Sequence, residues 1–201
     1  MINIEIDGKE VSVPKGGTIM DGAKQIGVYI PHFCYHKKLS IAANCRMCLV
    51  EVEKAPKPLP ACATPVMDGM KVSTRSDQAV TAQKGVMEFL LINHPLDCPI
   101  CDQGGECDLQ DISLTFGSDK GRFFEYKKRS VDNLNSCGPF IKTIMTRCIH
   151  CTRCVRYSTE IIGKKAMGTS SRGSTMEIGT YTESTDGSGN PIKSTTTKPD
   201  G

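Results

Sequence analysis

The first thirteen residues alternate between apolar and polar side chains, with isoleucine at positions 2, 4 and 6 and valine at positions 11 and 13. A period of two is typical of a half-buried strand, and Asp7-Gly8 is a favoured two-residue hairpin turn. Thr18 then precedes apolar residues at helical spacing, and Gly27 follows them. The pattern predicts a β-hairpin over residues 2–13 and a short helix capped by Thr18, and it is not that of a signal peptide.

A further strand, after the two of the hairpin, is predicted by the alternation of residues 48–53. The next segment, residues 54–60, holds three prolines, which lack the amide donors of a sheet, so it is predicted to be a loop that leads to Cys62. Asp68-Gly69 predicts a turn before a strand over residues 70–73.

The longest helix is predicted from Ser76 to Ile92, where apolar residues keep a helical period until Asn93-His94-Pro95 ends it. Residues 112–147 show no clear period, and no element is predicted there. Serine, threonine and glycine make up more than half of the segment 168–201. Such a segment buries little by itself, so it is either a disordered tail or a strand-and-loop ribbon held by a neighbour.

Composition excludes several classes of function. The chain has 201 residues and a net charge of +3, which is too small to indicate nucleic-acid binding. No continuous apolar stretch is long enough to span a membrane. Neither a nucleophile–base pair nor a glycine-rich phosphate loop is recognisable. We therefore expect no separate catalytic site and no membrane insertion.

The eleven cysteines are clustered instead of scattered. Paired Cys-x2-Cys spacings without a secretory signal indicate metal ligation in a reducing compartment. The first set is Cys34-x10-Cys45-x2-Cys48-x13-Cys62. A long loop with a further thiol from beyond the next strand can bring four thiolates to a [2Fe–2S] cluster from two sides. A zinc site of four thiolates is the alternative, although zinc sites usually show two compact knuckles.

The second set is His94-x3-Cys98-x2-Cys101-x5-Cys107. Three cysteines lack a fourth nearby, and a histidine nitrogen can complete a [4Fe–4S] cluster. The alternative for His94 is an ordinary helix C-terminal residue favoured by the macrodipole.

The third set has three thiols at every third position, Cys148, Cys151 and Cys154, a spacing typical of [4Fe–4S] proteins. A fourth thiol is missing, because no cysteine follows Cys154. Three arginines lie near these thiols in the sequence: Arg147, Arg153 and Arg156. They are interpreted as residues around the cluster whose positive charge offsets its negative charge, and the alternative is that they are ordinary surface charges. Cys137 stands apart and is interpreted as a buried free thiol.

These sets together resemble a known family. The hairpin and helix resemble the opening of the β-grasp fold of plant-type ferredoxins. The stretch His-Phe-Cys-Tyr-His-Lys-Lys-Leu-Ser around Cys34, the block Asn-His-Pro-Leu-Asp-Cys-Pro-Ile-Cys-Asp-Gln-Gly-Gly-Glu-Cys and the stretch Thr-Arg-Cys-Ile-His-Cys-Thr-Arg-Cys resemble the largest iron–sulfur subunit of respiratory complex I. The resemblance runs from residue 2 to about residue 181.

The resemblance implies an α+β architecture in four parts. They are a [2Fe–2S] ferredoxin-like β-grasp domain over 1–75, a histidine-ligated [4Fe–4S] domain of helix and loop over 76–137, a bacterial-ferredoxin-like [4Fe–4S] segment over 138–168, and a Ser/Thr/Gly-rich tail over 169–201. It implies ligation of a [2Fe–2S] cluster by the first set and of two [4Fe–4S] clusters by the second and third sets. The implied function is electron transfer from the NADH/flavin site toward quinone.

Two departures from the family matter. The family continues into a molybdopterin-oxidoreductase-like domain that is absent from these residues, and its distant fourth cysteine is replaced here by Thr195. We therefore expect the fourth ligand of the third cluster to come from another polypeptide that also carries the missing domain. The alternatives are that the third cluster is lost, that it is a [3Fe–4S] cluster, or that Cys137 is the fourth ligand.

The expected partners are the flavin-bearing, NADH-oxidising subunit and other hydrophilic-arm subunits. The expected location is the matrix side of the mitochondrial inner membrane, or the cytoplasmic side of a bacterial one. Two other functions fit the motifs: an iron–sulfur module of an NAD-reducing hydrogenase or formate dehydrogenase, and a zinc-stapled assembly scaffold without redox activity.

Overall fold

The computed structural model describes residues 1–127, 143–179, 184–185 and 191–192. Contacts divide the chain into two compact units. Unit 1 comprises Met1–Tyr35, Ile41–Ile92 and Leu96–Glu125, and unit 2 comprises His36–Ser40, Asn93–Pro95 and Tyr126–Gly201. Cys137 and Thr195 lie outside the described residues, so the expectations about them stay predictions.

Unit 1 is built on a five-stranded sheet in the order β2-β1-β5-β3-β4. The strands are β1 (Ile2–Ile6), β2 (Lys9–Val13), β3 (Leu49–Val52), β4 (Leu59–Pro60) and β5 (Lys71–Ser73). The predicted hairpin is confirmed, with Ile2 paired to Val13 and Ile6 to Lys9. β1 also pairs with β5 in parallel.

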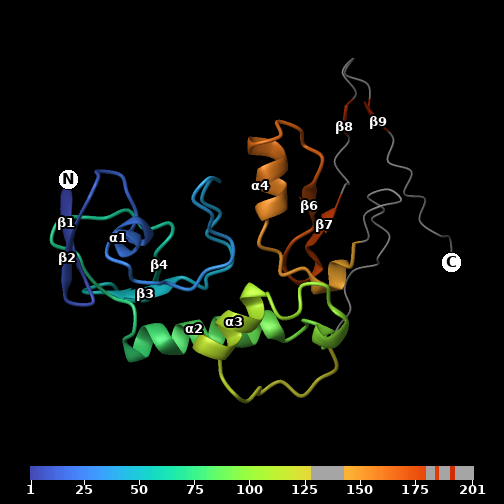
Figure 1. The fold of residues 1–201 in the computed structure, drawn as a ribbon, viewed down its shortest axis with the longest axis horizontal. Coiled ribbons are helices and arrows are strands. Elements are labelled where there is room, and N and C mark those ends of the chain that lie inside the picture. Colours follow the sequence, from blue (N-terminus) through green and yellow to red (C-terminus); the bar gives the residue numbers. More distant parts are fainter. Residues whose placement is uncertain (128–142, 180–183, 186–190, 193–201) are drawn as a thin grey trace. The chain divides into compact units, whose positions relative to one another are not determined.

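Helix α1 (Ile19–Gln25) lies against β1 and β2 (Figure 1). Thr18 caps it as predicted: its backbone and hydroxyl donate to the Asp21 carboxylate at 2.9 and 2.8 Å, and its hydroxyl accepts from the Asp21 amide. Gly22 faces the strands so closely that a Cβ there would lie 3.0–3.2 Å from side chains of Val13, Ile4 and Ile6. The helix therefore rests directly on the hairpin and encloses the core.

The prediction that residues 54–60 form a loop is wrong at its end. Leu59–Pro60 forms β4, which pairs antiparallel with β3 at the edge of the sheet. The Ala61 amide donates to the Cys48 carbonyl at 2.8 Å, so the neighbouring Pro60 nitrogen faces away from β3. A proline is tolerated there because its missing N–H would have pointed outward.

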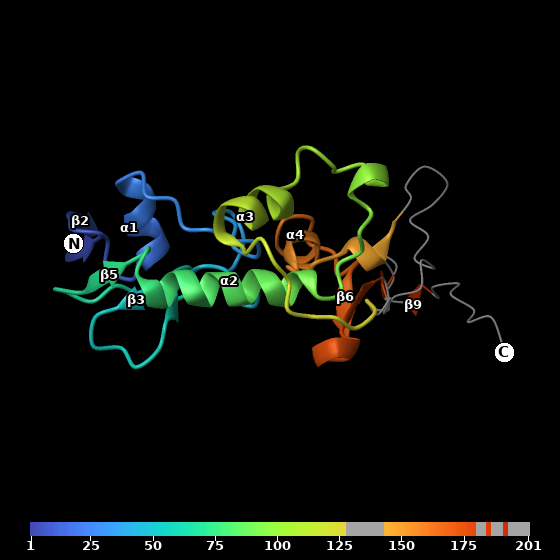
Figure 2. The ribbon, with the colours of Figure 1, turned by 90° about the horizontal axis from the view of Figure 1, so that it is seen from below.

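Helix α2 (Asp77–Leu91) is confirmed, with the Ser76 hydroxyl accepting from the Ala79 amide. Its fully buried residues are Ala79, Gln83 and Met87, whereas Phe89, part of the predicted apolar face, is 78% exposed. α2 packs on β3, and α3 (Asp108–Phe116) lies beside it (Figure 2). The sequence predicts no helix at α3. This helix begins directly after Cys107, and its buried residues are Leu109 and Ile112.

Unit 2 contains one α-helix and short strand pairs within its described residues. The elements are η2 (Met145–Arg147), α4 (Arg153–Glu160), β6 (Gly168–Ser170), η3 (Gly173–Thr175), β7 (Glu177–Gly179), β8 (Ser184–Thr185) and β9 (Pro191–Ile192). β6 pairs with β7 and β8 with β9, so the described part of the tail is a ribbon of strands and loops. Within the described residues, none of the helices has the length and apolarity to cross a membrane.

Gln83 joins α2 to the sheet by a buried hydrogen bond. Its side-chain Nε2 donates to the Leu49 carbonyl at 3.0 Å, and the residue is 2% exposed. The register of β5 on β3 ends where Ser73 faces Glu51, so Leu49 lies beyond the reach of that strand. Gln83 thus supplies the donor that a longer strand would have given.

Gln83→Met is expected to lower the free energy of unfolding by about 1–2 kcal/mol, because the Leu49 carbonyl loses its donor. Denaturant unfolding followed by circular dichroism measures the change. Lys84→Met, at an exposed position on the same helix, is the matched control and is expected to change stability by less than about 0.5 kcal/mol. Equal effects of the two substitutions would contradict a specific role for the Gln83 bond.

Candidate metal centres

The four cysteines of the first set meet inside unit 1. Cys34 lies in the loop after α1, Cys48 directly before β3, and Cys62 shortly after β4. These three side chains are 0–1% exposed, and Cys45 is half-buried. The thiols form two contacting pairs, Cys34 with Cys45 and Cys48 with Cys62, and Cys34 also contacts Cys62. Strands β3 and β4 thus deliver the second pair to a loop that carries the first.

Backbone amides point at these sulfurs. The Cys34 amide donates to the Cys45 sulfur at 3.4 Å. Backbone groups of Cys45 and Asn44 in turn bond the Cys34 sulfur. Ala43 and Arg46, at φ values of 53° and 59°, give the loop a left-handed backbone on either side of these residues. Such a concave backbone favours negatively charged sulfur.

The contacts also split the pKa values of the four thiols. Hydrogen bonds from Cys45 and Cys62 hold the pKa of Cys34 well below its usual range, and Cys62 likewise lowers that of Cys48. The same bonds raise the pKa values of Cys45 and Cys62, which keep their protons. Burial and the charges of Cys34 and Cys48 also disfavour the thiolate of Cys62, and a positive group at the centre of the four thiols would offset these charges.

The donor set fits a two-iron cluster. Such a cluster takes four cysteine thiolates, two at each iron, and the two thiol pairs match that division. Among the described residues, no three His, Cys, Asp or Glu side chains are placed around one point as a site for a single metal ion. The thiol contacts join Cys45 to Cys34, Cys34 to Cys62 and Cys62 to Cys48.

The three cysteines of the second set lie on one loop of unit 1. Cys98 begins the 3₁₀ helix η1 (Cys98–Ile100), and Cys107 caps the N-terminus of α3. The loop is held by its own bonds: the Gly104 amide donates to the Cys101 carbonyl at 2.9 Å, and the Gly105 amide donates to the Gln110 side chain at 3.0 Å. Gln110 was not recognised from the sequence, because its role depends on the helix that follows Cys107.

His94 is half-buried and belongs to unit 2, whereas the three cysteines belong to unit 1. Helix α2 ends at Leu91, as the Asn93-His94-Pro95 sequence predicts, so His94 lies on the connection from that helix to the cysteine loop. Ligation of one cluster by all four residues stays a prediction.

The three cysteines of the third set lie together in unit 2, between η2 and the first turn of α4. Each of the two gaps between these cysteines holds one left-handed residue, His150 with a φ of 55° and Thr152 with a φ of 59°, so the backbone reverses its sense between thiols. As a result the His150 amide donates to the Cys148 sulfur at 3.3 Å. Burial raises the pKa values of Cys148 and Cys154, and each thiol repels the charge of its neighbours.

The three arginines of this region are all partly buried. Arg156 is the best defined: its guanidinium donates to the carbonyl oxygens of Cys151, at 3.2 Å, and Ser40, at 2.6 Å. Its charge also favours the thiolate of Cys154. Sequence reasoning missed Ser40, which lies 116 positions away and carries no motif. The role of Arg147 and Arg153 as residues that offset the cluster charge stays a prediction.

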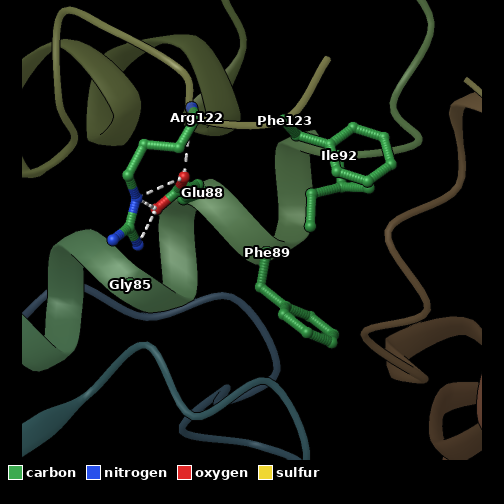
Figure 3. Close-up of a pocket in the computed structure, with 6 residues that line it drawn as sticks. All are labelled: Gly85, Glu88, Phe89, Ile92, Arg122 and Phe123. Atoms are coloured by element: carbon green, nitrogen blue, oxygen red, sulfur yellow. Dashed lines mark hydrogen bonds and ion pairs between the residues drawn. The ribbon is translucent and has the colours of Figure 1, made fainter. Parts of the chain in front are cut away.

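A pocket of about 340 Å³ lies on unit 1, and no cysteine lines it (Figure 3). It is lined by Gly85, Glu88, Phe89, Ile92, Arg122 and Phe123. Its charged residues are already paired, with Arg122 donating to both Glu88 oxygens at 2.6–3.1 Å. This ion pair, which lowers the pKa of Glu88, fastens the segment after α3 to α2. The lining offers no arrangement for acid–base or nucleophilic chemistry.

Three family models match successive parts of the chain. Residues 1–77 match a 2Fe-2S iron-sulfur cluster binding domain, residues 83–122 an NADH-ubiquinone oxidoreductase-G iron-sulfur binding region, and residues 138–192 an NADH-quinone oxidoreductase subunit 3, ferredoxin-like domain. These matches confirm an α+β chain of iron–sulfur domains.

Similar proteins span nearly the whole chain. The NADH-ubiquinone oxidoreductase 75 kDa subunit of Reclinomonas americana is 56% identical over 99% of this chain and 30% of its own length. The iron-sulfur protein 1 of NADH dehydrogenase [ubiquinone] from Solanum tuberosum is 56% identical over 99% of this chain and 28% of its own length. The NADH-ubiquinone oxidoreductase 78 kDa subunit of Neurospora crassa is 57% identical over 90% of this chain and 24% of its own length. The chain thus spans less than a third of the length of these relatives.

A solved structure is also similar. The crystal structure of an NAD+-reducing [NiFe]-hydrogenase in its H2-reduced state contains a chain with 26% sequence identity and a TM-score of 0.76, with 94% of this chain and 77% of that chain covered. The likeness therefore extends over the described fold of both units.

Gly104→Ala is expected to disrupt the loop of the second set. A Cβ on Gly104 would lie 2.7 Å from the Cys98 carbonyl oxygen and 3.1 Å from that of Cys101, and these are backbone atoms that must move. Iron and acid-labile sulfide in the purified assembly are expected to fall by about one cluster's content. Gly85→Ala is the control, because a Cβ there meets nothing within 4 Å. Undiminished iron in Gly104→Ala would contradict the expectation.

Proposed function

We infer the function of this chain from the family to which it belongs, that of the 75 kDa iron–sulfur subunit of NADH-ubiquinone oxidoreductase. We propose that it relays electrons from the NADH/flavin site toward quinone and makes or breaks no covalent bond of a substrate. The observation that carries the proposal is the convergence of four mutually contacting thiols, three of them buried and one half-buried. That donor set suits an electron carrier and offers no group for acid–base chemistry.

The proposed [2Fe–2S] ligands are Cys34, Cys45, Cys48 and Cys62. A bound iron–sulfur cluster supplies a site that takes up and releases one electron. The chain's own contribution is the loop whose amides point at sulfur and the burial that keeps water away. Both features set the reduction potential, because hydrogen bonds to sulfur stabilise the more negative, reduced state, whereas exclusion of solvent disfavours it.

For the second centre we propose a [4Fe–4S] cluster held by His94, Cys98, Cys101 and Cys107. The support is the spacing of these residues, the self-bonded loop that carries the three cysteines, and the iron–sulfur family match over residues 83–122.

For the third centre we propose a [4Fe–4S] cluster held by Cys148, Cys151 and Cys154. Residues 155–201 contain no cysteine, so its fourth ligand is proposed to come from outside these 201 residues. The support is the geometry of the loop, in which the His150 amide donates to the Cys148 sulfur. A hydroxyl such as that of Thr195 is a poor substitute, because iron in these clusters is held by thiolate or imidazole.

The proposed partners follow from the family. They are the flavin-bearing, NADH-oxidising subunit and other hydrophilic-arm subunits of complex I. The proposed location is the matrix side of the mitochondrial inner membrane, with the cytoplasmic side of a bacterial inner membrane as the alternative.

An iron–sulfur module of an NAD-reducing hydrogenase is a second candidate function. The similar fold of the NAD+-reducing [NiFe]-hydrogenase chain favours it, but the identity to that chain is 26% against 56% for the complex I subunits. The subunits that copurify with this chain distinguish the two: hydrogenase subunits would refute the complex I assignment.

The isolated chain is expected to contain less iron and sulfide than the same chain in the assembled complex, by the content of one [4Fe–4S] cluster. The reason is that the third set offers three thiols, whereas the cluster requires four ligands. Iron and sulfide analysis with reduced-state EPR measures the difference. A complete third cluster in the isolated chain would refute an external ligand, and a colourless, EPR-silent complex would refute the redox function itself.

His94→Cys in the assembled complex is expected to keep the second cluster but lower its midpoint potential, because a thiolate adds negative charge where a neutral imidazole stood. His94→Gln, which offers no suitable ligand, is expected to lose that cluster's EPR signal. Redox titration monitored by EPR compares both with the unmodified complex. The proposal that His94 is a ligand would be wrong if both variants kept the EPR signal and the midpoint potential of the second cluster in the unmodified complex.

A further inference from the structure

The segment His36–Ser40 belongs to unit 2, although the residues on either side of it belong to unit 1. It lies within the long span between Cys34 and Cys45. Every polar group of Ser40 is bonded to helix α4: its amide donates to Glu160 Oε2 at 2.8 Å, its hydroxyl donates to Glu160 Oε1, and its carbonyl accepts from Arg156 Nη1 at 2.6 Å. One residue of a cluster-binding loop is thus fully engaged by the helix that begins beside Cys154.

The same guanidinium reaches the cysteine loop of the third set. Arg156 Nη2 donates to the Cys151 carbonyl at 3.2 Å, and its Nε lies 3.4 Å from the Thr152 hydroxyl. Arg156 therefore links two carbonyl oxygens that are far apart in sequence. A planar guanidinium can do this because its donors diverge in a fixed fork, whereas the ammonium of a lysine is a single point of charge.

Glu160 completes the arrangement from one turn further along α4. Residues four apart lie on the same face of a helix, so the Glu160 carboxylate and the Arg156 guanidinium can both bond Ser40. Glu160 holds the amide and hydroxyl of Ser40, and Arg156 holds its carbonyl. The Ser40 carbonyl accepts from Nη1 of Arg156, and the Cys151 carbonyl accepts from its Nη2.

Two roles for Arg156 can be separated by these contacts. As a charge it would offset the negative thiolates, and any cation at this place would serve. As a positioning residue it would fix the peptide of Cys151, and only the forked guanidinium would serve. The three hydrogen bonds described above end on the carbonyl oxygens of Ser40 and Cys151 and on the Thr152 hydroxyl. That pattern is the one expected of a positioning residue.

We propose that Ser40, Arg156 and Glu160 form a clamp that positions the Cys148–Cys154 loop, and that the long Cys34–Cys45 span supplies Ser40 to it. The clamp rests on the proposed function in that Cys151 is taken as a cluster ligand. Arg156 acts through the Cys151 backbone, and Glu160 acts through Ser40 and Arg156.

The test uses the assembled complex with Arg156→Lys, Glu160→Ala and, as the matched control, Thr159→Ala. The Thr159 hydroxyl is exposed and donates to the Val155 carbonyl of its own helix. Hydrogen exchange at the Ser40 amide reads the clamp directly, whether or not clusters are present. Reduced-state EPR and redox titration read the third cluster, whose signal is identified as the one that Cys151→Ser loses.

In Glu160→Ala the Ser40 amide is expected to exchange about tenfold faster or more, because a charged acceptor is lost. The EPR signal of the third cluster is expected to shift or broaden in Glu160→Ala and in Arg156→Lys alike, whereas Thr159→Ala leaves both readouts unchanged.

An unmodified signal and potential in Arg156→Lys would overturn the positioning role in favour of charge alone. Unchanged exchange at Ser40 in Glu160→Ala would overturn the clamp. Absence of any cluster signal from the unmodified complex would instead refute the proposed function, and the exchange measurement would still decide whether the clamp exists.

Discussion

Four thiols in one buried place impose the constraint on which unit 1 depends. Their mutual hydrogen bonds divide them into two that lose protons readily and two that hold them. The backbone also donates to these sulfurs: Asn44 and Cys45, which lie between the left-handed residues Ala43 and Arg46, bond the Cys34 sulfur. The hairpin, α1 and the β3–β4 pairing build the core that keeps Cys48 and Cys62 in place. The ordinary β-grasp-like packing thus serves to fix a small, polar, strongly interacting centre.

The two units use one device for their cysteine loops. Ala43 and Arg46 in unit 1, and His150 and Thr152 in unit 2, all have positive φ without being glycine. Near Ala43 and Arg46, backbone groups of Asn44 and Cys45 bond the Cys34 sulfur, and in unit 2 the His150 amide donates to the Cys148 sulfur. A left-handed residue costs free energy in an ordinary loop, and here it lies beside groups that carry negative charge. Side-chain identity at these positions matters less than the direction in which the peptide turns.

Much of unit 1 could be predicted from sequence, because its elements follow local rules. The hairpin turn at Asp7-Gly8, the Thr18 cap and the Ser76 start of α2 are each determined by neighbouring residues. β4 was missed because proline argues against a strand unless the edge position of Pro60 is known. Ser40 and Glu160 could not be found, because hydrogen bonds over 120 positions leave no periodic signal. The cysteine spacings indicated the first set of ligands, but its pairing required the fold.

The proline in β4 also affects how this sheet can grow. β4 is the outermost strand on its side and is two residues long, and the nitrogen of Pro60 faces outward without a hydrogen to donate. An incoming strand would find no amide at that position and no length on which to establish a register. This edge of the ferredoxin-like sheet is therefore protected from strand addition.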